Sequence, residues 1–315
     1  MRSPKLTQSV FPSALILSLI GLQPSCAVIT KSQRAEVAAF AKVASNYGTL
    51  PGEPIRSYGH ATRFDRLLNV SAHDFQSESA RTNAWAEIAK AIETDKKFDE
   101  AARQADAALD VLDQYVEILT LLSSDEFTDA LDKSAKELGA SVDKGIKSYN
   151  QTFLVPKGQK ELAPVGATVA AAVQGAGGIY IRYRQAKLLK NAVVTANPVV
   201  AALTHNIAGL MRDKVKPYLT QANERLGDDF KNAARQAKDL PFGTIQEVAF
   251  QVERSQNAFQ LAEAAAKASE SLAASHKKLA AELTSRKSIE DRIQEIQALA
   301  DEIKAAQKLQ KALSK

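Results

Sequence analysis

Residues 162–181 read LAPVGATVAAAVQGAGGIYI, and residues 192–211 read AVVTANPVVAALTHNIAGLM. Neither stretch contains an aspartate, glutamate, lysine or arginine. A helix that is apolar on every side is stable where other helices or lipid surround it. The two stretches therefore predict an apolar helix pair, residues 162–211, around which the rest of the chain is arranged.

This apolar pair fits either a buried core or a hairpin that enters a bilayer. Each stretch is long enough to span the hydrocarbon layer. Four basic residues stand between the stretches: Arg182, Arg184, Lys187 and Lys190. However, Pro164 and Gly175 in the first stretch, and Asn197, Pro198 and His205 in the second, weaken both as membrane spans. We expect a buried core and keep membrane entry as the alternative, with a break or kink at Asn197-Pro198.

The flanking sequence predicts an all-α fold. Apolar residues recur every three or four positions, and no useful alternation of apolar and polar residues occurs. The predicted helices span residues 31–47, 62–68, 71–122, 127–150 and 244–313, and a further helix continues from the second apolar stretch through residues 203–233. Possible capping pairs mark three of the starts: Ser71 with Asp74, Ser123 with Glu126, and Thr244 with Glu247. The architecture expected is an elongated multi-helix bundle with long antiparallel coiled-coil-like helices and an apolar central helix pair.

Two places in this pattern are irregular. Residues 48–59 (GTLPGEPIRSYG) are expected to form a loop because Pro51, Gly52 and Pro54 punctuate them. In the last helix, the step from Leu283 to Ile289 is one residue short of a heptad, which predicts a local phase slip.

The N-terminus predicts an export signal over residues 1–26. Arg2 and Lys5 precede an apolar segment, residues 10–22, that is too short to span a bilayer comfortably. The segment LQPSC ending at Cys26 resembles the lipobox of bacterial lipoproteins, although its leucine lies four residues before the cysteine instead of three. The resemblance implies lipidation of Cys26 and a periplasmic or outer-membrane-anchored protein. Cleavage after Ala27 with secretion, or an uncleaved anchor, are the alternatives.

After the signal, the sequence suggests two parts. Residues 27–70 are expected to hold an N-terminal helix and the Pro/Gly loop, and residues 71–315 the helical bundle. With Arg2 and Lys5 removed, the formal net charge falls from +5 to +3. This small excess, without aromatic residues interleaved in a basic patch, gives no reason to expect a nucleic-acid partner.

Residues with catalytic or ligand-binding chemistry are sparse. His60, His73, His205 and His276 show no metal-ligand spacing. They are expected to be packed or boundary residues, with a pH-sensing role of His205 as a minor alternative. The glycines at 175, 177 and 178 lack the lysine and serine or threonine of a phosphate loop. We therefore expect no enzyme activity, no cofactor, no metal and no small-molecule substrate.

We expect a structural or protein-interaction role at the cell envelope. The expected partners are a membrane, through the lipid on Cys26, and a protein or second copy that binds helix faces. The alternative is a membrane-active protein that inserts residues 162–211. Long helices around an apolar hairpin resemble the layout of helical pore-forming toxins of the haemolysin E type, without a shared motif.

Overall fold

The computed structural model describes residues 29–47, 50–71, 76–124, 129–158, 160–166, 181–236, 241–284 and 292–313. No strand occurs in these ranges, which confirms the all-α prediction for them. Cys26 with the export signal, and residues 167–180 of the first apolar stretch with its glycines, lie outside the described residues. Predictions about them stay predictions.

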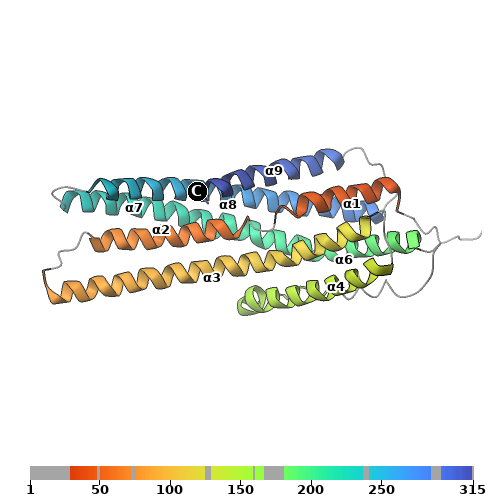
Figure 1. The fold of residues 1–315 in the computed structure, drawn as a ribbon, viewed down its shortest axis with the longest axis horizontal. Coiled ribbons are helices and arrows are strands. Elements are labelled where there is room, and N and C mark those ends of the chain that lie inside the picture. Colours follow the sequence, from red (N-terminus) through yellow and green to blue (C-terminus); the bar gives the residue numbers. More distant parts are fainter. Residues whose placement is uncertain are drawn as a thin grey trace, which may run out of the picture.

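The helices lie side by side along one long axis (Figure 1). They are α1 (Lys31–Ala44), α2 (Gly52–Ser71), α3 (Glu78–Ser123), α4 (Asp129–Tyr149), α6 (Ile181–Leu210), α7 (Lys216–Gln236), α8 (Phe242–Thr284) and α9 (Arg292–Leu313). We call the end where α1 begins and α8 ends the proximal end; there Gln33 Nε2 donates to the Glu282 carbonyl over 3.4 Å. The distal end is where α2 and α7 end and α3 and α8 begin.

The second apolar stretch lies in the core, on α6. Its fully or almost fully buried residues are Ala192, Val193, Ala196, Val199, Val200, Leu203, Ile207, Ala208 and Met211. They pack in one apolar cluster with α1, α3 and α8. Among the described residues, one helical path, Gln185–Asn232, is long and apolar enough to cross a membrane, and 44% of its most apolar window is buried.

The helix does not break at Asn197-Pro198, so the break that the sequence predicted there was wrong. α6 continues through Pro198 to Leu210. The Pro198 ring is exposed, whereas its neighbours Val199 and Val200 are buried, and their burial offsets the backbone hydrogen bond that proline removes. A π-helical turn follows α6 over Met211–Val215, two residues before Pro217.

The expected loop at residues 48–59 is largely helix, because α2 begins at Gly52. Pro54 lies in the first turn of α2, where a backbone N–H has no partner within the helix and its loss costs little. Gly59 serves close packing: a Cβ added there would lie 2.7 Å from Phe98 Cβ on α3. The small residues that predicted a loop thus bring α2 and α3 together.

The start of α3 also differs from the prediction. Ser71 is the last residue of α2, and α3 begins at Glu78 after Ser77, whose Oγ accepts from Ala80 N over 3.1 Å. The end of α3 at Ser123 and that of α4 at Tyr149 agree with the sequence to within a residue. The N-cap of α1 was missed: Thr30 and Gln33 form a reciprocal capping box.

The predicted helix over residues 244–313 is two helices. α8 ends at Thr284, and α9 packs back along α8 from Arg292 to Leu313. The short step between Leu283 and Ile289 coincides with this division. A change of heptad phase therefore marked a reversal of the chain.

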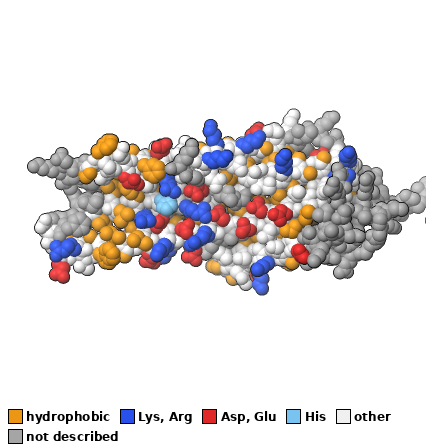
Figure 2. Space-filling view, in the orientation of Figure 1, with side chains coloured by type: hydrophobic (Ala, Val, Ile, Leu, Met, Phe, Trp, Pro, Cys, Tyr) orange, Lys and Arg blue, Asp and Glu red, His pale blue; other side chains and the backbone are white. Residues whose placement is uncertain are grey.

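Ion pairs join α2 to α3. Arg56 Nη2 lies 2.6 Å from Asp106 Oδ2, and Arg66 Nη1 lies 3.3 Å from Glu87 Oε2. Residue numbers rise on α2 as they fall on α3, so the two helices run in opposite directions. Basic and acidic side chains intermingle over the middle of the face in Figure 2. Burial raises the pKa of Asp106, outweighing the attraction of Arg56.

Candidate functional site

Of the three histidines that the structure describes, His276 is the one in the core, and His205 is exposed. The burial on which a pH-sensing role of His205 was based is therefore wrong. His60 is half-buried on α2 and its Nδ1 lies 3.4 Å from Asp95 Oδ1, and burial lowers its pKa. His73 lies outside the described residues. Of the four basic residues between the two apolar stretches, Lys187 is exposed and Lys190 is half-buried on α6.

His276 joins three helices through two hydrogen bonds. Its Nε2 lies 2.7 Å from Tyr115 Oη on α3, and its Nδ1 lies 3.1 Å from Asn197 Oδ1 on α6. Because a carboxamide oxygen only accepts, Nδ1 carries the proton and Tyr115 donates to Nε2. Phe40 of α1 and Tyr115 lie edge-on to the ring. Burial lowers the pKa of His276 to about 3.

The polar atoms of His276 and Tyr115 are hydrogen-bonded and closed to solvent. His276 and Tyr115 have 0% and 3% of their surface exposed, so no substrate reaches their polar atoms. The arrangement fixes the mutual positions of α3, α6 and α8, which is the use that a satisfied buried network has in a core. We therefore assign this hydrogen-bond network a role in holding the three helices together.

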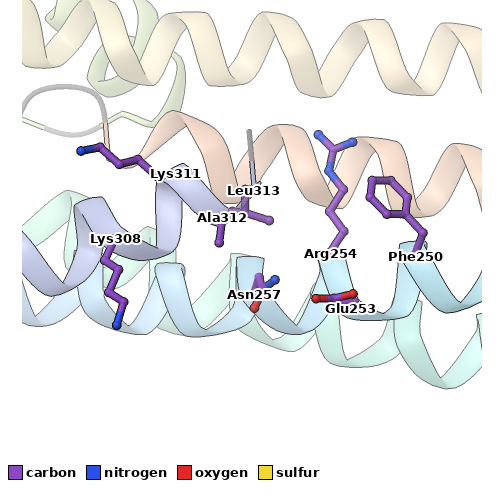
Figure 3. A pocket seen from close by; sticks show the side chains of 8 residues that line it. All are labelled: Phe250, Glu253, Arg254, Asn257, Lys308, Lys311, Ala312 and Leu313. Carbon is purple, nitrogen blue, oxygen red and sulfur yellow. The ribbon is translucent and has the colours of Figure 1, made fainter. Parts of the chain in front are cut away.

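A cleft of about 500 Å³ opens where α9 ends on α8 (Figure 3). Its lining residues are Phe250, Glu253, Arg254, Asn257, Lys308, Lys311, Ala312 and Leu313. Figure 3 shows Phe250 and Arg254 rising from the same side of α8, with Ala312 and Leu313 of the last turn of α9 beside them. Its volume is in the range of ligand sites.

The charges of this cleft are three cations and one acid. Arg254 reaches Glu53 of α2 at 4.0 Å, and its Nε is buried without a hydrogen-bond partner. Lys308 and Lys311 are exposed on α9 and make no ion pair with the described residues. The cleft is therefore amphipathic, with apolar Phe250 and Leu313 beside a positive charge.

The cleft continues onto an open part of α8. Along α8, residues 250, 254, 257, 261, 264 and 268 recur at spacings of four and three, and α9 packs along this side of the helix. Beyond the end of α9, α8 runs on to Phe242 toward the distal end (Figure 1). Of residues 242–250 only Thr244 and Val248 are not exposed. We call residues 242–250 the α8 shelf.

Large apolar side chains gather at the distal end. Trp85 near the start of α3 and Phe242 at the start of α8 are 72% and 71% exposed, although such residues are usually buried. Ile245 and Phe250 of the α8 shelf are also exposed. Figure 2 shows hydrophobic side chains clustered over this end of the molecule. Large exposed apolar side chains of this kind are candidates for contact with another molecule.

The sequence could not identify this site. The seam pattern alone made residues 250 and 254 part of one long helix, and the cleft exists because α9 turns back and ends opposite them. Within the described ranges, no three His, Cys, Asp or Glu side chains are grouped as metal ligands. Comparison of the chain with protein-family models, curated proteins and solved structures finds no match.

Proposed function

We propose that this chain is a non-catalytic interaction protein of the cell envelope, exported and anchored through a lipid on Cys26. In this proposal it is an elongated bundle whose long helices pair as antiparallel coiled coils. It acts as a spacer that presents its distal end, and the α8 shelf, to a protein partner.

The proposal is supported by the distance along the bundle between the first described residues and the exposed aromatic side chains. The described chain enters the bundle at the proximal end, where Ile29 precedes α1, and Cys26 is three residues earlier in the sequence. The exposed aromatic residues Trp85 and Phe242 belong to helices that begin at the distal end. A lipid at Cys26 would hold the proximal end near a membrane and leave the aromatic end free.

The length of the helices sets the reach of such a spacer. α3 has 46 residues and α8 has 43. At about 1.5 Å per residue, each is about 65–70 Å long. The distal end would thus stand well beyond the lipid headgroups, where a soluble domain of another protein can reach it. Stable attachment needs more than one acyl chain, because a single chain binds a bilayer only marginally.

Mass spectrometry of the mature N-terminus tests the anchor. We expect an acylated chain that begins at Cys26 and sediments with membranes. Cys26→Ser should release the protein, whereas Ser25→Ala, a small-residue change beside it, should not. An unmodified chain that begins at Val28 would contradict the lipid anchor and favour secretion.

A second candidate function is membrane insertion of residues 162–211. It is supported by the long apolar helical path Gln185–Asn232. Its test is release of an encapsulated dye from liposomes of anionic and neutral lipid between pH 4 and 8. Leakage that a charged substitution at buried Val200 abolishes, in a variant that still folds, would favour this function; no leakage at any pH would dismiss it.

A further inference from the structure

We infer that α4 and a short segment after it form a lid over the apolar side of α6, and that this lid opens as one unit while the rest of the bundle stays folded. The segment is residues 160–166, of which 160–165 are not helical, and we call it the strap. The inference deepens the second candidate function, because a role of the opened surface in meeting lipid rests on that function.

The strap is fixed to α4 through its backbone. Asn150, the residue after α4, forms two hydrogen bonds with Leu162: its Nδ2 donates to the Leu162 carbonyl and its Oδ1 accepts from Leu162 N, both over 2.9 Å. Asp143 Oδ1 accepts from Val165 N over 2.8 Å and from Gly166 N over 2.6 Å. Since each end of the strap is bonded to this helix segment, we expect α4 and the strap to move together.

The underside of the lid is apolar. Val142, Ile146 and Tyr149 recur on one face of α4 and, with Val165 of the strap, are at most 5% exposed. Val142 and Val165 lie against α3 and α6, where the residues around them include Val111, Leu112, Val199, Val200 and Leu203. The lid thus covers part of the second apolar stretch.

The seat of the lid is on the outside of the bundle. α4 lies along α3 at the edge of the molecule in Figure 1, and its Lys144 and Lys147 are exposed. Asn206 Nδ2 on α6 donates to Tyr149 Oη over 3.0 Å. A space of about 10 Å³ remains between Val142 and the side chains beneath it, and such a gap forfeits part of the dispersion attraction. This contact is therefore largely apolar and not completely filled.

The helices under the lid are joined to one another without it. His276 links α3, α6 and α8 through Tyr115 and Asn197. Gln185 Nε2 at the start of α6 donates to the Leu122 carbonyl at the end of α3 over 2.9 Å. Because these bonds do not involve the lid, its departure leaves them intact. Peripheral units of this kind are the ones that open locally below the free energy of global unfolding.

Opening of the lid would change both apolar stretches at once. It would bare Val199, Val200 and Leu203 of α6, which belong to the uncharged residues 192–211. Residues 162–166 of the strap begin the first apolar stretch and would leave with α4. One movement would therefore separate the start of the first stretch from the second and expose the α6 surface that insertion into a bilayer requires.

Amide hydrogen exchange of the purified chain, followed by mass spectrometry without lipid, tests the opening. We expect residues 138–149 and 160–166 to exchange together, and at least about tenfold faster than residues 258–272 of α8. Exchange of the lid should also depend less steeply on urea, because its opening exposes less surface than global unfolding. Equal rates and equal urea dependence in the lid and α8 would overturn the inference.

A matched pair of glycine variants tests the seat. A Cβ added at Gly145 of α4 would lie 2.5 Å from Val111 Cγ2 on α3, whereas one added at Gly227 of α7 meets nothing within 4 Å. Gly145→Ala should therefore speed exchange of the lid at least about fivefold, and Gly227→Ala should change it less than about twofold. Unchanged exchange of the lid in Gly145→Ala would also overturn the inference.

A third variant tests whether the lid is one unit. Asn150→Ala removes both bonds to Leu162, so residues 160–166 should then exchange faster than residues 138–149. Separate exchange of these two segments already in the original chain would contradict a single unit.

Dye release from liposomes then separates the lid from its membrane role. If the second candidate function holds, Gly145→Ala should release dye at least about fivefold faster than Gly227→Ala, in step with its lid opening. Opening in solution without any dye release would refute the second candidate function and confirm the lid. Dye release without lid opening would refute the lid and leave that function.

Discussion

Acid should destabilise this protein through His276, and the contribution of this one residue can be isolated. The imidazole is buried and neutral in the folded protein, with a pKa of about 3 against an ordinary 6.5. Between these two pH values the unfolded chain binds a proton that the folded protein does not. Stability is therefore complete above pH 6.5 and falls as the pH falls toward 3.

The size of this effect follows from the pKa difference. Each pKa unit is worth about 1.4 kcal/mol, so the full loss is about 5 kcal/mol, of which about 3 kcal/mol has occurred at pH 4. That is a large part of the stability of a typical domain. The cause is desolvation, since both ring nitrogens are occupied by Tyr115 and Asn197 and no carboxylate touches the ring.

The assay is urea unfolding at pH 7, 6, 5 and 4, followed by circular dichroism. The comparison variant is His276→Leu with Tyr115→Phe, which removes the titrating ring and the hydroxyl that would lose its acceptor. At pH 7 the two proteins should differ by about 2 kcal/mol or less. We expect the stability of the original chain, relative to this variant, to drop by about 1.4 kcal/mol per pH unit below 6.5. Since all other groups that titrate between pH 4 and 7 are shared, parallel pH profiles would refute the buried neutral histidine.

Three further predictions concern other contacts. Gly59→Ala should lower the free energy of unfolding by about 1–3 kcal/mol because the added Cβ meets Phe98. Gly227→Ala, at a helical site with open space, should raise the free energy of unfolding by about 0.5–1 kcal/mol. Thermal unfolding of both variants checks this, and equal effects would contradict the close contact of α2 and α3. Arg56→Ala should lower the free energy of unfolding by about 1–3 kcal/mol because it removes the ion-pair partner of the half-buried Asp106 carboxylate. Arg212→Ala, which breaks an exposed ion pair with Glu270, should lower it less. Chemical denaturation of both variants measures the two effects. Burial and a hydrogen bond with Asp229 raise the pKa of Asp65 to about 7, so the stability that this residue contributes falls as the pH rises from about 4 to 7. After allowance for solvent screening at this half-exposed site, Asp65→Asn should stabilise the protein by about 1–2 kcal/mol at pH 8 and by little at pH 4. A gain of equal size at both pH values would contradict this prediction.

Local sequence determined where much of this protein is helical. Val37, Phe40, Ala41 and Ala44 share one face of α1, and the structure buries that face. The ends of α3 and α4 could be placed because side-chain caps and changes in apolar spacing act over a few neighbouring residues. The burial of residues 192–210, the part of α6 without charged side chains, followed from that lack of charge, because an apolar helix surface is stable only when covered.

Only the tertiary structure decided how these helices meet. Gly52 and Gly59 lie in the stretch that was predicted to be a loop. Their lack of a side chain instead lets α3, which is distant in sequence, pack closely against α2. A proline inside α6 is tolerated because buried neighbours stabilise the helix around it. The reversal between α8 and α9 creates both the cleft and the α8 shelf, and the partners of His276 come from helices about 80 and 160 residues away. Periodicity specifies which face of a helix is covered but not which helix covers it, since that depends on the shape of the whole core.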